Sequence, residues 1–153
     1  MPDYPVYPDQ KYSNQQITSS CKGALPQNVI AGLELFNAGE YFEAHEELEL
    51  AWRAEHNPVR EVYRGVLQIG VAYYHILNNN FNGAVKMFQR AWPWLAPFPQ
   101  ICRGIDIGTL CRDARRVEAE ILRLGADRLR EFDPSQIKPV RFTLSKKGSK
   151  DES

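Results

Sequence analysis

The segment from Pro58 to Asn78 constrains the fold more than any other, because its apolar residues cover most of the circumference of a helix. At about 100° per residue they form one broad face with flanking positions: Val62, Val66, Ile69, Tyr73, Ile76 and Leu77, with Tyr63, Leu67 and Tyr74 beside them. A helix that is apolar on most sides has to be surrounded by other elements. We therefore expect it at the centre of an all-α protein.

Apolar residues at helical spacing predict further helices before and after this segment. The expected ranges are 26–37, 41–56, 58–78, 81–92 and 108–132. Pro93 is expected to end the fourth helix, because a proline removes a helical hydrogen bond and clashes with the preceding turn. The last helix is expected to have a cap at Asp106 or Thr109 and an interruption at Gly125. The prediction is a compact bundle of about five helices.

Two of the expected helices repeat each other at a distance of forty residues. The aligned pairs are Tyr41 and Phe81, Ala44 and Ala84, Leu48 and Phe88, Ala51 and Ala91, and Trp52 and Trp92. Alanine at two of the positions allows a neighbouring helix to approach closely. The spacing resembles the second helix of tetratricopeptide repeats, which implies two helical hairpins. We expect the long C-terminal helix to close the bundle, because two hairpins alone would expose apolar faces.

The chain of 153 residues is 43% hydrophobic, which is enough for one domain with a core. Residues 1–24 combine Pro with Ser, Asn and Gln without any apolar period, so we interpret them as a flexible N-terminal arm. Residues 25–132 are expected to form a single helical domain. Residues 133–153 are expected to be an extended or disordered tail, with a short extended segment at 140–144.

Charge and cysteine content indicate the cellular compartment and the types of partner of the protein. It has 19 basic and 19 acidic residues, so no overall positive charge favours nucleic acid. No apolar run approaches the roughly 18 residues that cross a bilayer. The three cysteines are odd in number and form no CxxC pair, which favours free thiols over a disulfide. We therefore expect a protein of the cytoplasm or the plastid stroma, with no nucleic-acid or membrane partner.

A narrow polar stripe interrupts the apolar surface of the central helix. Arg64, Gln68 and His75 fall within about 40° of one another around the helix axis. The preceding helix carries His45, Glu46 and Glu49, with Tyr41 and Trp52 as aromatic neighbours on the same helix. If the two helices pack antiparallel, these side chains can meet inside the bundle. The sequence thus predicts one polar cluster between them.

This cluster has a structural and a functional interpretation. In the structural one, Arg64 pairs with Glu46 or Glu49 and the histidines satisfy the remaining hydrogen bonds. In the functional one, His and Glu on facing helices act as an acid/base pair in a cleft or bind a metal, with His45, Glu49 and His75 as weak ligand candidates. Neither HxxxH nor ExxH spacing occurs on these helices, and we expect no cofactor.

Residues 36–53, with the sequence FNAGEYFEAHEELELAWR, resemble the family known as domain of unknown function 309. The continuation from Arg60 to Gln68, then His75 and the segment 80–84, is similar to the rest of that family's signature. The resemblance implies a compact helical bundle and no particular activity. It also implies that the following positions belong to the family motif: Glu43, His45, Glu46, Glu49, Trp52, Arg64, Gln68 and His75.

Two functions are compatible with these observations. The first is a non-catalytic protein-interaction module with a structural polar network and an unidentified protein partner, favoured by the repeat and by the lack of catalytic motifs. The alternative is a small enzyme, or a ligand- or metal-binding domain, that uses His45, Glu46, Glu49 and His75. We favour the interaction module.

Overall fold

The computed structural model describes residues 11–144, which form a compact, mostly helical bundle with one small sheet. The helices are α1 (Asn14–Ser20), α2 (Gln27–Asn37), α3 (Tyr41–Ala54), α4 (Arg60–Leu77), α5 (Phe81–Leu95) and α6 (Ile107–Leu124). The strands are β1 (Ile101–Cys102) and β2 (Ile105–Asp106), and two 3-10 helices span Ala126–Glu131 and Pro134–Gln136. The all-α prediction is confirmed. The first ten residues and the tail SKKGSKDES lie outside the described part.

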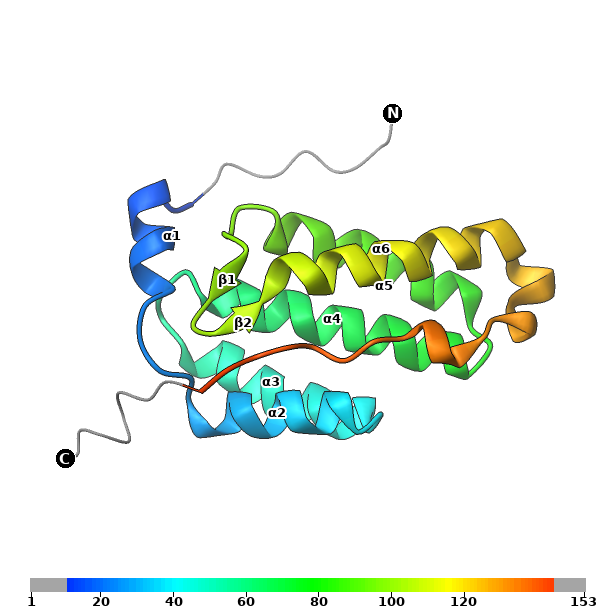
Figure 1. Cartoon of the computed structure of the whole chain (residues 1–153), viewed down its shortest axis with the longest axis horizontal. Helices are drawn as coiled ribbons and strands as arrows, with labels where there is room; N and C mark the ends of the chain where they lie inside the picture. The colour runs from blue at the N-terminus through cyan, green and yellow to red at the C-terminus, as the bar shows by residue number, and fades with distance from the viewer. Residues whose placement is uncertain (1–10, 145–153) are drawn as a thin grey trace.

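Helix α4 occupies the centre, as its apolar circumference predicted. Figure 1 shows it between α2 and α3 on one side and α5 and α6 on the other. Tyr63, Ile69 and Tyr73 of α4 are fully buried. Gly65 allows α5 to approach closely, because a Cβ atom at this position would lie 2.5 Å from Leu95 Cγ. The core is therefore built around α4 by contact with both neighbouring hairpins.

The aligned positions of α3 and α5 have similar environments. Ala44 and Ala84 are both buried, and Leu48 and Phe88 are also buried. The aromatic rings of Phe88 and Trp92 stack with their centroids 6.0 Å apart. The two helices thus present equivalent apolar rows to the core, whereas similarity to tetratricopeptide repeats stays a prediction.

The end of α5 differs from the prediction. Pro93 does not end the helix, which continues through it to Leu95. A proline so close to the C-terminus removes only one helical hydrogen bond, and the buried Leu95 stabilises the last turn. Helix α6 begins where it was expected, because the Asp106 carboxylate accepts the Thr109 N–H at 3.0 Å. It ends at Leu124, before Gly125, whose φ of 75° strongly favours glycine. The expected continuation of the α-helix to residue 132 is therefore wrong, because Ala126–Glu131 form a 3-10 helix.

The N-terminal region contains the largest departures from the sequence analysis. Part of the expected flexible arm is helix α1, which begins with a capping box in which Ser13 and Gln16 exchange hydrogen bonds. A disulfide joins Cys21, just after α1, to Cys102 in β1, and Cys111 is the free cysteine. The prediction of three free thiols is therefore wrong. The bonded cysteines are 81 residues apart, so only the tertiary fold brings them together.

Residues 137–144 lie along the bundle in an extended conformation (Figure 1). Asn37 at the end of α2 both donates to the Val140 carbonyl at 2.9 Å and accepts the Val140 N–H at 2.8 Å. Phe142 forms a β-bridge with Ile105, next to the β1–β2 hairpin. Within residues 11–144, no helix is long and apolar enough to cross a membrane.

Candidate functional site

The acidic and histidine candidates of α3 lie on its outer surface. His45 Nε2 is 3.9 Å from Glu49 Oε1, and Arg53 donates to Glu49 Oε2 at 2.7 Å. The hydrogen bond from Arg53 lowers the pKa of the Glu49 carboxyl below its usual value. Glu43 and Glu46 are exposed. These residues form a local surface group rather than the interior cluster that the sequence predicted.

His75 belongs to a separate group at the turn between α4 and α5. Its Nδ1 is 3.2 Å from the side-chain nitrogen of Asn80. The oxygen of the same Asn80 side chain accepts the Gly83 N–H at 2.9 Å and caps α5. Among the described residues, no polar contact connects His75 with His45. The expected convergence of the two histidines is therefore not observed.

Arg64 instead forms the centre of a cluster that draws on three helices. Its guanidinium carbon lies 4.4 Å from the ring centroid of Trp52 on α3 and 3.9 Å from that of Trp94 on α5. A guanidinium over the face of an indole is attracted by the negative face of the ring. Trp94 was missed in the sequence because Pro93 was expected to end the helix before it.

The ionic partner of Arg64 is Glu61 of its own helix, not Glu46 or Glu49. Arg64 Nε is 3.1 Å from Glu61 Oε1, and Arg60 Nη1 is 3.7 Å from Glu61 Oε2. Glu61 is only 7% exposed, so it needs this pairing with cations. Burial lowers the pKa of Arg64, whereas the charge of Glu61 acts in the opposite direction.

We call this group the Arg64 cluster; its members are Trp52, Arg60, Glu61, Arg64, Gln68 and Trp94. Arg60 also lies over Trp52, with its guanidinium carbon 5.0 Å from the ring centroid. The Trp52 Nε1 donor and the Gln68 Oε1 acceptor are buried, and neither has a hydrogen-bond partner in the described structure. Such unpaired buried atoms are uncommon in folded proteins. The cluster thus has two guanidinium groups for one carboxylate. The Trp52 N–H and the Gln68 carbonyl oxygen make no hydrogen bond to another member of the cluster.

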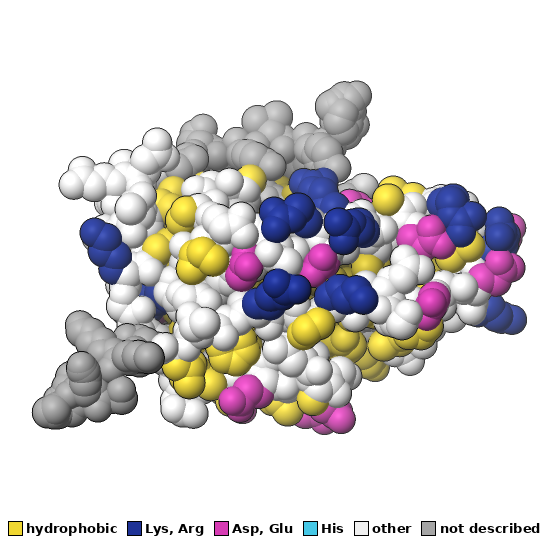
Figure 2. Space-filling model, viewed as in Figure 1, with side chains coloured by type: hydrophobic (Ala, Val, Ile, Leu, Met, Phe, Trp, Pro, Cys, Tyr) yellow, Lys and Arg dark blue, Asp and Glu magenta, His cyan; other side chains and the backbone are white. Residues whose placement is uncertain are grey.

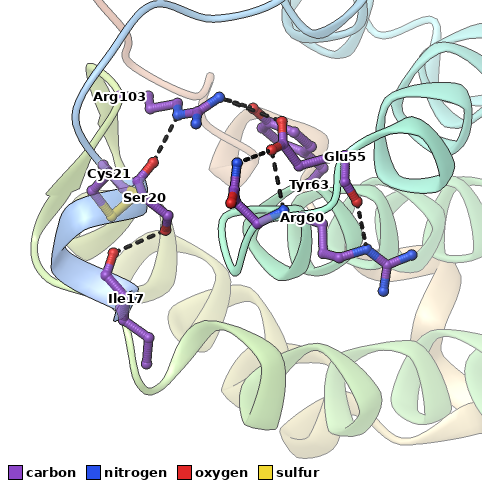
Figure 3. Close-up of polar contacts among 9 residues, drawn as sticks. Ile17, Ser20, Cys21, Glu55, Arg60, Tyr63 and Arg103 are labelled. Carbon is purple, nitrogen blue, oxygen red and sulfur yellow. Dashed lines mark hydrogen bonds and ion pairs between the residues drawn. A yellow bond between two sulfur atoms is a disulfide. The ribbon is translucent and has the colours of Figure 1, made fainter. Parts of the chain in front are cut away.

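A polar network connects the Arg64 cluster with α1. Figure 3 shows Arg103 between the end of α1 and the connection from α3 to α4. Arg103 Nε donates to the Ser20 carbonyl at 2.8 Å, and its Nη1 is 3.4 Å from Glu55 Oε1. The Glu55 carbonyl accepts Arg60 Nε at 2.9 Å. The route from α1 to the cluster therefore runs through Arg103 and Glu55.

Tyr63 and Tyr12 add to this region. Arg103 Nη1 also donates to the Tyr63 hydroxyl at 3.3 Å, and burial raises the pKa of Tyr63 to about 12. Tyr12, which precedes α1, lines a polar pocket together with Pro58 and Arg103. The segment before α1 therefore lies beside the connection from α3 to α4.

The positive charge of α6 is largely balanced by its own acidic residues. Figure 2 shows Lys and Arg side chains gathered on the face that is turned to the viewer in Figure 1. Arg115 is 3.9 Å from Glu118, and Arg116 is 3.6 Å from Asp113.

Among residues 11–144, no group of three or more His, Cys, Asp or Glu side chains is arranged to hold a metal ion.

The fold and the cluster define a compact all-α protein with a central apolar helix and a guanidinium held between two indole rings. Residues 29–87 match the model of the family described as "Domain of unknown function (DUF309)", as the sequence motif predicted. The matched part runs from α2 into α5, so it contains Trp52 and Arg64 and ends before Trp94.

A curated protein is similar to about half of this chain. It is an uncharacterized protein of Aquifex aeolicus (strain VF5) and is 28% identical over 76 residues, which is 49% of this chain. The aligned region is only 23% of the length of that relative.

Proposed function

We propose that the protein is a non-catalytic interaction module and that its partner binds at the Arg64 cluster. The observation that carries the proposal is the assembly of two Trp and two Arg side chains from three helices at a partly open surface. The side chains of Arg60 and Arg64 are 23% and 21% exposed. Trp and Arg are enriched among the residues that dominate binding energy at protein interfaces.

The chemistry of the cluster favours an acidic partner segment that carries an aromatic or aliphatic residue. Arg60 and Arg64 face a single carboxylate, that of Glu61, so the cluster has an excess of one positive charge. Guanidinium groups bind carboxylates with two parallel hydrogen bonds. The rings of Trp52 and Trp94 supply apolar surface beside the cations.

The alternative, a small enzyme or a ligand- or metal-binding domain, has less support. It would need His45, Glu46, Glu49 and His75 to act together. His45 and Glu49 are 3.9 Å apart, but Glu46 is exposed and His75 interacts with Asn80 at a helix turn. A shared acid/base or metal function requires convergent side chains.

Fluorescence anisotropy tests the proposed function. The probe is a fluorescein-labelled decapeptide of Glu and Gly residues with one central Phe. We expect saturable binding that weakens by about tenfold or more in Arg60→Gln and Arg64→Gln. Arg116→Gln is the matched control, because Arg116 is 76% exposed and pairs with Asp113 on α6. Absence of saturation, or equal affinity in all three variants, would contradict the proposal.

We also propose that the protein works in the cytoplasm or the plastid stroma. Such compartments keep most thiols reduced, so the Cys21–Cys102 disulfide would form only under some conditions there. Alkylation of thiols in acid-quenched extracts tests this proposal. A mixture of reduced and oxidised protein supports it, whereas complete oxidation under every growth condition contradicts it.

A further inference from the structure

We propose that the Cys21–Cys102 disulfide is a reversible latch, which holds α1 beside the Arg64 cluster and hinders access of an acidic partner until it is reduced. The part that concerns the partner rests on the proposed function. The part that concerns the release of α1 does not.

Helix α1 is too short to be stable by itself. It has seven residues, whereas isolated helices shorter than about 12 residues are marginal in water. Ile17 and Ser20 are its buried residues, and Ile17 is not part of the contiguous apolar core. Its position therefore depends on the burial of Ile17 and on the bonds that attach its end to the bundle.

The noncovalent attachment of that end is small. Arg103 donates its backbone N–H to the Cys21 carbonyl at 2.8 Å and its Nε to the Ser20 carbonyl at 2.8 Å. A polar cavity of about 520 Å³ lies beside α1, between Gln16 and Ser19 on one side and His56 and Asn57 on the other. The helix is thus loosely packed here, and the disulfide is its strongest attachment (Figure 3).

The release of α1 would reach the proposed binding surface by two routes. Tyr12, just before α1, lines this polar cavity together with Pro58, which precedes Arg60 by two residues. Arg103 would lose its acceptor at Ser20 while it still contacts Glu55, whose carbonyl holds Arg60. We therefore expect Arg60 and Arg64 to become more accessible when α1 leaves.

The chemistry of opening needs a dithiol reductant. A thiolate of the reductant attacks Sγ of Cys21, because Cys21 is partly exposed whereas Cys102 is fully buried. The S–S bond breaks, and Sγ of Cys102 leaves with the electron pair and takes up a proton. The second thiol of the reductant then displaces Sγ of Cys21, which is protonated in turn. Two electrons and two protons reduce the protein, and the reductant becomes a disulfide.

Hydrogen exchange measured by mass spectrometry tests the release of α1. We expect amides 17–22 to exchange at least about tenfold faster in the dithiothreitol-reduced protein and in Cys21→Ser than in the oxidised protein. Amides of α4 should stay far more protected than amides 17–22 in both redox states, which shows that the bundle stays folded. Cys111→Ser is the matched control, since Cys111 is outside the disulfide. Equal protection of amides 17–22 in the oxidised and reduced states would overturn the latch.

Peptide binding in both redox states tests the effect on the partner. With the Glu/Gly/Phe decapeptide we expect the reduced protein to bind about tenfold more tightly than the oxidised protein. Equal binding in both states would overturn the regulation and leave the proposed function intact. Absence of binding in both states would overturn the proposed function together with its regulation, while the exchange measurement still decides whether α1 is released.

Discussion

Replacement of Arg64 by Met measures how much the Arg64 cluster stabilises the fold. Methionine keeps most of the length of the side chain and its apolar contact with Trp52 and Trp94, but it removes the charge. Glu61 then keeps only Arg60, whose Nη1 is 3.7 Å from Glu61 Oε2. The substitution therefore separates the ionic and cation–π interactions from simple filling of space.

The expected loss of unfolding free energy is about 3 kcal/mol. Removing one member of a buried ion pair costs about 3–5 kcal/mol, and we take this range to include the other contacts of the removed charge, here with the two indole rings. The lower end applies because Arg60 still compensates Glu61 and because the Arg64 side chain is 21% exposed. Arg116→Met, at a side chain that is 76% exposed, should change stability by less than about 0.5 kcal/mol.

Urea unfolding followed by circular dichroism provides the measurement. The double variant Glu61→Gln/Arg64→Met should lose less stability than the sum of the single variants, by about 1–2 kcal/mol, because the two side chains interact directly. A loss below about 1 kcal/mol for Arg64→Met, or strict additivity with Glu61→Gln, would refute the reasoning.

Three further results are expected. Burial raises the pKa of Glu118 in the folded state above its unfolded value of about 4. The free energy of unfolding should therefore fall as the pH rises from about 4 through the raised folded pKa. Glu118→Gln should abolish this fall, as measured by urea unfolding at pH 4 and pH 8. Gly65→Ala should cost about 1–3 kcal/mol in thermal unfolding, because the new Cβ meets Leu95, and an unchanged melting temperature would contradict the close packing. Reduction of Cys21–Cys102, which are 81 residues apart, should lower the unfolding free energy in guanidinium by up to about 4.5 kcal/mol, and a change below about 1 kcal/mol would contradict the prediction.

Local patterns in the sequence were sufficient to predict most of the helices. Tyr63 and Tyr73 are buried because α4 is apolar around most of its circumference, and such a helix has to lie at the centre of the bundle. The end of α6 at Gly125 follows from its helix-breaking residue, and its start follows from the Asp106 cap. These features depend on residues within one or two turns of each other, so the sequence alone contains the necessary information.

The candidate site was predicted only in part. Arg64 lies over the ring of Trp52, and Gln68 follows Arg64 by one turn of α4 with a buried side-chain oxygen. His45 and His75 do not join it, because the choice of ionic partner depends on which side chains the packing buries. Glu61 is buried three residues before Arg64, and a buried carboxylate pairs with the nearest cation.

The sequence by itself determined the presence of helices α2 to α6, the central place of α4 and the family resemblance of residues 29–87, because each depends on short-range spacing. Only the tertiary structure decided that Trp94 stacks on Arg64 and that Cys21 bonds with Cys102. Both contacts join residues that are far apart in the chain. Their proximity is set by the packing of whole helices against α4, which buries apolar surface. The local spacing of residues in the sequence does not show which of these distant residues will meet.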